Sequence, residues 1–128
     1  MINRDDAFEL LEENLSNRNL VRHCLATEAV MRGLAENRGE DVDLWGITGL
    51  LHDLDYEKTV NDPARHGLIT ALMLTGQLPE ESIYAIKSHN YENNGIERIS
   101  NFDHLLAAGE SITGLIVAVT LVYPEKKL

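Results

Sequence analysis

The sequence has little of what several classes of protein require. A single cysteine, Cys24, excludes an intramolecular disulfide, and we expect it to pack in the core. Only 11 lysines and arginines accompany 21 acidic residues, and a net charge of −10 argues against a nucleic-acid polymer as partner. The longest nearly uncharged apolar stretch, Ile112 to Tyr123, is shorter than the roughly 20 residues that cross a bilayer. These shortages predict a soluble protein without a membrane span.

Length and amino-terminal composition limit how the chain is organised. At 128 residues it is long enough to bury one core, so we expect a single domain over residues 1–128. The first twenty residues have no basic segment followed by an apolar one, so no secretory signal is visible. Together with the lone cysteine, this predicts a cytoplasmic protein.

Capping signals divide the chain into helices and leave little of the alternation typical of strands. Asp41 and the pair Asp62-Pro63 are typical of helix starts, and Gly39 and Pro124 of helix ends. The polar stretch Asn90 to Asn101 is predicted as a loop. The predicted fold is all-α, a compact bundle of about six helices. They are expected over residues 5–15, 19–37, 41–54, 62–76, 79–89 and 102–122.

The dipeptide His52-Asp53 ends an apolar run and is the most informative feature of the chain. The apolar residues of the third predicted helix are distributed around most of its circumference, which predicts that the helix is largely buried. At its last turn the backbone opens, and both side chains can face a common centre. Because the helix dipole disfavours an anion at this end, Asp53 indicates a cation nearby. Exposure of the last helical turn would be the competing explanation.

Glu110 is a second carboxylate in apolar surroundings. It shares a stripe with Leu106, Thr113 and Val117, so we expect it to be substantially buried. Burial of an unpaired carboxylate costs several kcal/mol, and an arginine, a proton or a metal ion would remove that cost. Asp103, one heptad earlier, is the rival candidate, although a solvated acid is favoured in a first helical turn.

Three more histidines accompany this pair. His23 lies at the edge of an apolar stripe, His66 in the first turn of the fourth predicted helix, and His89 at the end of the fifth. At that first turn the helix dipole should hold His66 neutral and able to bind a metal. Each one alone could be a core, surface or capping residue. Together with His52, Asp53 and Glu110 they offer enough ligands for two ions that share Asp53.

The order of these residues resembles the HD-domain superfamily of metal-dependent phosphohydrolases. The resemblance covers about residues 18–122, and Gly49-Leu-Leu-His-Asp-Leu54 is its most specific segment. Ala107-Ala-Gly-Glu-Ser-Ile-Thr-Gly-Leu115 is the next. The family implies one ion on His23, His52, Asp53 and the position of Glu110, where glutamate replaces the usual aspartate. Subgroups with a second ion have histidines at the places of His66 and His89.

The chemistry implied by this resemblance is hydrolysis of a nucleotide or another small phosphate ester. In the family, Asp53 and His52 would be catalytic, since the ions that they bind activate a water molecule. A ligand set rich in histidine favours Mn, Fe, Co, Ni or Zn over magnesium, with one or two ions bound. The oligomeric state is not predicted.

Contacts to the substrate are harder to assign. Lys58, Arg65 and Lys87 are the basic residues expected nearest to the ions, where they would bind phosphate oxygens, although solvated surface positions would also explain them. Asp55 could orient a ligating imidazole or simply end a helix. The alternative to an enzyme is an inactive binding or sensor domain of the same fold, and a third possibility is a helical adaptor without a metal.

Overall fold

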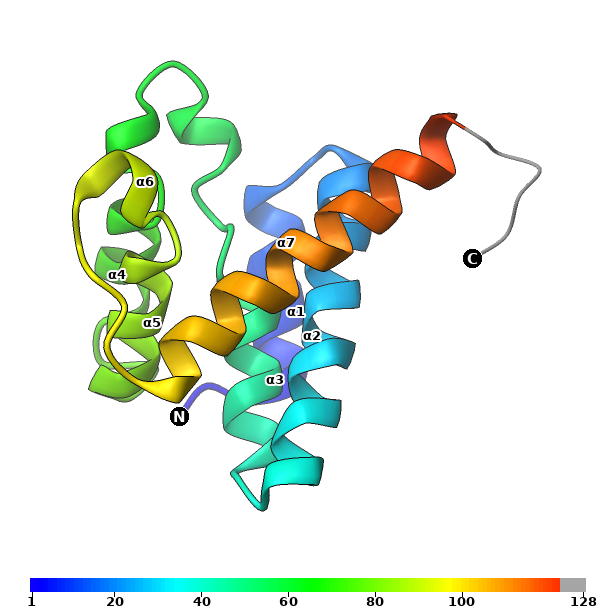
Figure 1. The fold of residues 1–128 in the computed structure, drawn as a ribbon. Helices are drawn as coiled ribbons and strands as arrows, with labels where there is room; N and C mark the ends of the chain where they lie inside the picture. The colour runs from blue at the N-terminus through cyan, green and yellow to red at the C-terminus, as the bar shows by residue number, and fades with distance from the viewer. Residues whose placement is uncertain (123–128) are drawn as a thin grey trace.

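In a computed structural model the chain is an all-α bundle, as the sequence predicted (Figure 1). The structure describes residues 1–122, which contain no β-strand. Two short 3-10 turns, η1 (Glu57–Thr59) and η2 (Pro63–Arg65), interrupt the helices. The helices are α1 (Arg4–Asn14), α2 (Arg18–Arg38), α3 (Val42–Leu51), α4 (Leu68–Leu74), α5 (Glu80–Ser88), α6 (Tyr91–Asn94) and α7 (Asn101–Val122).

Local capping fixes the boundaries of the first three helices. The side chains of Asn3, Asn17 and Asp41 accept hydrogen bonds from backbone N–H groups in the first turns of α1, α2 and α3. Gly39 ends α2 in the left-handed region at φ 70°, where a glycine is favoured. These caps set the register in which α2 and α3 pack against each other.

Helix α3 is the centre of the bundle. Every residue from Leu44 to Leu51 is buried, and Trp45 stacks on Phe102 of α7 with ring centroids 4.7 Å apart. Helices α1 and α2 pack on one side of α3, and α5 packs on another. The residues that follow α3 therefore emerge in the interior of the molecule.

Helix α7 crosses the bundle diagonally and packs against both α2 and α5 (Figure 1). Its stretch Asn101–Val119 is long and apolar enough to cross a membrane by length and composition, and 33% of it is buried. The sequence-based expectation that no segment is long and apolar enough to span a membrane is therefore not met by the criteria of length and composition.

Two predicted boundaries are wrong. The fourth helix begins at Leu68 rather than at Asp62-Pro63. Pro63 starts only the 3-10 turn η2, and Gly67, with φ 89°, separates that turn from the helix. His66 therefore has extended backbone and precedes α4. In addition, the stretch predicted as a loop contains the four-residue helix α6, which Gly95 ends in the left-handed region.

Candidate metal centre

His52 is held at the carboxyl end of α3 with one nitrogen in use. Its Nδ1 lies 2.6 Å from the carbonyl oxygen of Gly49, and because a carbonyl only accepts, Nδ1–H is the donor. The other nitrogen, Nε2, is buried, has no hydrogen-bond partner, and lies 3.3 Å from Asp53 Oδ2. A buried lone pair without a donor beside a carboxylate fits a cation between them.

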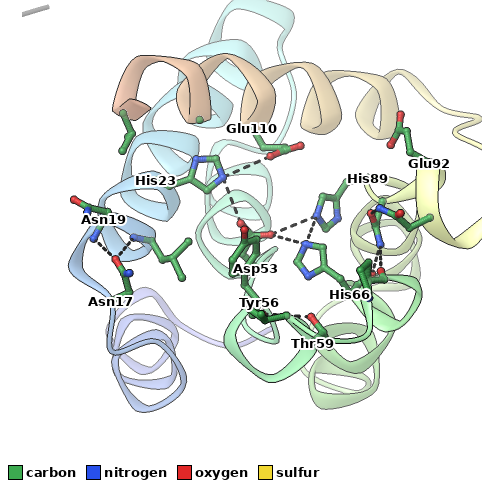
Figure 2. Close-up of a pocket in the computed structure, with 17 residues that line it drawn as sticks. Asn17, Asn19, His23, Asp53, Tyr56, Thr59, His66, His89, Glu92 and Glu110 are labelled. Carbon is green, nitrogen blue, oxygen red and sulfur yellow. Dashed lines mark hydrogen bonds and ion pairs between the residues drawn. The ribbon is translucent and has the colours of Figure 1, made fainter. Parts of the chain in front are cut away.

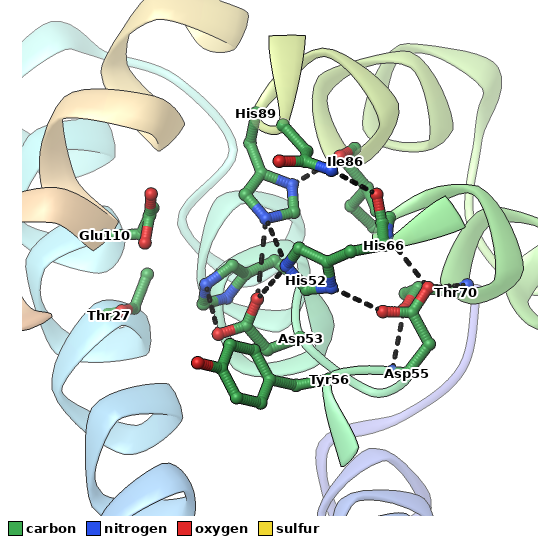
Figure 3. Close-up of polar contacts among 12 residues, drawn as sticks. Thr27, His52, Asp53, Asp55, Tyr56, His66, Thr70, Ile86, His89 and Glu110 are labelled. Carbon is green, nitrogen blue, oxygen red and sulfur yellow. Dashed lines mark hydrogen bonds and ion pairs between the residues drawn. The ribbon is translucent and has the colours of Figure 1, made fainter. Parts of the chain in front are cut away.

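The carboxylate of Asp53 lies at the centre of four imidazoles (Figures 2 and 3). Its Oδ2 is 3.4 Å from His23 Nε2 and 3.3 Å from His52 Nε2. Its Oδ1 is 3.0 Å from His66 Nε2 and 3.4 Å from His89 Nε2. Each oxygen thus faces its own pair of histidines, which is the arrangement that a carboxylate shared by two ions requires.

Helices α2 and α7 complete the Oδ2 side. His23 Nδ1 lies 3.2 Å from the hydroxyl of Thr113, which leaves Nε2 facing Asp53 and, at 3.5 Å, Glu110 Oε2. Figure 2 shows Glu110 descending from α7 toward His23. The side chain of Glu110 is 23% exposed, so it is partly buried, and its longer arm reaches the site.

Asp103, the rival of Glu110, lies elsewhere. It is buried rather than solvated, and its carboxylate accepts hydrogen bonds from the backbone N–H groups of Ile99 and Ser100. The hydroxyl of Ser100 accepts in return from the N–H of Asp103, which makes a reciprocal cap at the start of α7. Backbone N–H groups therefore compensate the buried carboxylate of Asp103. Of these two acids, Glu110 is the one that lies beside the histidines.

On the Oδ1 side, Asp55 orients His66 (Figure 3). The Nδ1–H of His66 donates to Asp55 Oδ1 at 2.6 Å. The other oxygen of Asp55 accepts from the backbone N–H groups of Gly67 and Thr70, each at 2.8 Å. Three hydrogen bonds thus fix a fully buried carboxylate, which directs His66 Nε2 at Asp53.

His89 completes the second pair from the end of α5. Its Nδ1–H donates to the carbonyl oxygen of Ile86, and its Nε2 lies 3.2 Å from His66 Nε2. Because both Nδ1 atoms are donors, the two Nε2 atoms would face each other with lone pairs alone. Either a proton or a metal ion has to lie between them.

In the metal-free chain, protons supply this positive charge. Burial lowers the pKa of His66, but hydrogen bonds to Asp53 and Asp55 outweigh burial and raise the pKa to about 10. Burial likewise lowers the pKa of His23, and Asp53 with Glu110 raises it to about 9. The expected effect of a helix dipole on His66 is wrong, because His66 precedes the helix and contacts two carboxylates.

The donor set fits divalent transition metals. Two groups of donors have ligand atoms within 4.8 Å of one another: His23, His52 and Glu110, and Asp53, His66 and His89. Cys24 is buried and its sulfur falls within the same distance of His52 and Asp53. Nitrogen donors with carboxylate oxygens suit Mn, Fe, Co, Ni and Zn better than they suit magnesium.

A cavity of about 720 Å³ opens beside these groups (Figure 2). Five of the predicted metal-binding residues line it, whereas His52 is fully buried and does not. Sequence reasoning missed the neutral polar side chains of the wall, because Asn, Tyr and Thr are ordinary in caps and turns. Those that line the cavity are Asn17, Asn19, Tyr56, Thr59, Asn90 and Asn93.

The three predicted basic contacts do not line this cavity. The ammonium group of Lys58 donates to Asn14 Oδ1, and Arg65 lies on the surface, 3.9 Å from Asp62 Oδ2. Lys87 is partly buried on α5. The geometry therefore gives no support to direct phosphate contacts from Lys58, Arg65 or Lys87.

Comparisons with known proteins agree with the motifs. The family model of the HD domain matches residues 20–120. No curated protein and no solved structure matches the chain. The matched region contains all six predicted metal-binding residues, from His23 to Glu110, and covers most of the sequence. The chain therefore belongs to the HD-domain family.

Proposed function

We propose that this protein is a metal-dependent phosphohydrolase that cleaves a nucleotide or another small phosphate ester with a water molecule. The observation that carries the proposal is the position of Asp53, whose two oxygens each face a pair of imidazole Nε2 atoms. When bound, one or two divalent ions would lower the pKa of a water molecule and neutralise phosphate oxygens.

The residues of the chain prepare the site before any ion binds. Gly49, Asp55 and the carbonyl of Ile86 occupy the Nδ1 atoms of three histidines, so that only the Nε2 atoms face the centre. Burial raises the pKa of Asp53, but His52 and the other imidazoles outweigh it and hold the pKa well below its usual range. Asp53 is thus ionised and available as a shared ligand at neutral pH.

The partner in this proposal is a small phosphorylated molecule rather than a nucleic acid or a membrane. A net charge of −10 repels phosphate polymers and anionic lipid surfaces, so attraction has to come from a few local cations. A cytoplasmic location, where phosphate esters are abundant, belongs to the same proposal.

Replacement of Asp53 by alanine tests the proposal. We expect Asp53→Ala to lose both bound metal and phosphoester hydrolysis, with kcat lowered by at least about a hundredfold, since changes beside a metal ligand already cost up to that much. Elemental analysis and initial rates with a generic phosphoester in manganese are the measurements. Asp53→Asn keeps the shape of the side chain and should lose activity too, while Asp62→Ala, at an exposed aspartate, should change neither.

The outcome also separates the alternatives. Full activity in Asp53→Ala would contradict the proposed role of Asp53. Near-stoichiometric metal without hydrolysis of any phosphoester would instead identify a binding or sensor domain. If the purified protein takes up no transition metal, a helical adaptor is the remaining interpretation.

A further inference from the structure

Building on the proposed function, we propose that the substrate carries one phosphate group on an uncharged polar body, and that the cavity discriminates against di- and triphosphates. The inference rests on the charges of the cavity wall. It names a class of substrate that the histidine cluster alone does not specify.

The wall of the cavity contains carboxylates but neither lysine nor arginine among the described residues. Its ionisable residues are Tyr56, three histidines and the acidic residues Asp53, Glu92 and Glu110. Proteins that hold polyphosphates supply basic side chains or backbone N–H groups for each phosphate. Here positive charge is concentrated at the histidine cluster.

Two arginines that contact residues of the wall are engaged by other groups. Arg98 donates to the carbonyl oxygens of Ser88 and His89 and to the carboxylate of Glu92, all within 3.0 Å. Arg22 donates to the side-chain oxygen of Asn19 at 3.2 Å. Both guanidinium groups thus have protein partners, and neither arginine is among the residues that line the cavity; Arg98 lines a smaller neighbouring pocket with His89 and Glu110.

A single phosphate is enough to offset the positive charge of the loaded site. Two divalent ions against the carboxylates of Asp53, Asp55 and Glu110 would leave a net charge of about +1, which a single phosphomonoester of about −2 at neutral pH already offsets. Each further phosphate would add negative charge that no lysine or arginine of the described wall offsets.

The rest of the wall suits an uncharged polar body. Asn19, Asn93 and Tyr56 bring amide and hydroxyl groups to the wall, and Leu20 with Val117 adds an apolar surface. The volume of about 720 Å³ is in the range of sites for small molecules. Sugars and nucleosides present this mixture of hydroxyl groups and flat apolar faces.

Binding and turnover of a matched series test the inference. We would measure kcat/KM of the manganese-loaded protein for adenosine mono-, di- and triphosphate, and calorimetric binding of non-hydrolysable phosphonate analogues of the mono- and triphosphate. We expect both to fall by about tenfold or more from one phosphate to three, or about 1.4 kcal/mol. Equal or tighter binding of the triphosphate analogue would overturn the inference.

A pair of neighbouring variants tests the cause. Val60 lines the cavity and is 62% exposed, whereas Asn61 is exposed and lies outside the lining. Val60→Lys should bring a cation to the wall and reduce the preference for the monophosphate over the triphosphate. Asn61→Lys should leave that preference unchanged. An equal effect of both variants would mean that net charge, and not the wall, sets the preference, which contradicts the inference.

Two further outcomes keep the two proposals apart. A preference for the monophosphate in binding, without hydrolysis of any phosphate, would support the inference and overturn the hydrolase. Rapid hydrolysis of the triphosphate would support the hydrolase and overturn the inference. Lys126 and Lys127 lie outside the described residues, and if their joint replacement by alanine weakens binding of the monophosphate analogue, cations beyond this wall recognise phosphate and the inference fails.

Discussion

The two sides of Asp53 are supported by different kinds of structure. The Oδ2 side comprises His23 and Glu110 on the long helices α2 and α7, with His52 at the end of α3. The Oδ1 side comprises His66, which precedes α4 between a 3-10 turn and Gly67, and His89 at the end of α5. One side depends on helix packing, and the other on hydrogen bonds that fold an irregular segment.

Asp55 replaces helix packing on the second side. It fixes His66 directly and holds the backbone of Gly67 and Thr70, while Asn90 donates to the carbonyl oxygens of Pro63 and His66. A few polar contacts therefore carry the geometry of this half. We expect substitutions there to affect one ion, whereas core substitutions affect the fold.

The largest difference should come from removing one imidazole on each side. His66→Ala should lose the ion on the Oδ1 side and His23→Ala the ion on the Oδ2 side, so each should retain about half of the metal of a two-ion protein. Elemental analysis with circular dichroism would measure metal and helix content. His104→Ala, at an exposed histidine that does not line the main cavity, is the control. Unchanged metal in His66→Ala would indicate a single-ion site.

A smaller effect is expected from Asp55→Asn. The amide keeps the size of the carboxylate but loses its charge and one acceptor, so His66 should be less well oriented. We expect the affinity for the second ion to fall about 10- to 100-fold, while the first ion binds as before. Metal titration followed by calorimetry resolves the two events, and Asp62→Asn serves as a surface control. Equal weakening of both ions would mean that Asp55 supports the fold and not one half of the site.

The two sides of Asp53 also differ in how far the sequence predicted them. The apolar surroundings of His52-Asp53 and of Glu110 identified both as anomalous, because charge in an oily helix needs a partner. Of Glu110 and Asp103, the sequence favoured Glu110, which lies 3.5 Å from His23, whereas Asp103 is also buried but accepts hydrogen bonds from backbone N–H groups. On the side built from helices, periodicity was sufficient.

Around His66 the local signal was misleading. Asp62-Pro63 is typical of a helix start, but Asp55 takes the N–H groups of Gly67 and Thr70 and so favours a later start, at Leu68. Such a contact joins residues 15 positions apart, from Asp55 to Thr70, and has no periodic signature. Lys58, Arg65 and Lys87 were expected at the cavity because they are close to the motif in sequence. They do not line it, since which residues meet at a cavity depends on contacts between distant parts of the chain.

Gly67 and Gly76 offer a matched test of crowding on the second side. Both have positive φ, 89° and 86°, but a Cβ at Gly67 would lie 3.1 Å from the carbonyl oxygen of Ile86, whereas Gly76 has open space. Each alanine variant should lose about 1 kcal/mol of unfolding free energy through strain. Only Gly67→Ala should also weaken the second ion, because Ile86 holds His89. Equal metal affinity in the two variants would show that the loop tolerates the contact.

The last comparison is the pH dependence of the metal-free protein, to which one histidine from each side of Asp53 contributes. The pKa values of about 9 for His23 and about 10 for His66 lie above the ordinary 6.5, so both rings bind protons more tightly in the folded state. The stability that they add is therefore fully present below pH 6.5, declines as the pH rises, and is gone above about pH 10. Denaturant unfolding of metal-free protein at several pH values would measure it. In His66→Ala the decline should end nearer pH 9, because only His23 then titrates, and a stability that is flat from pH 6.5 to 10 in the parent chain would mean that the rings do not share protons with Asp53.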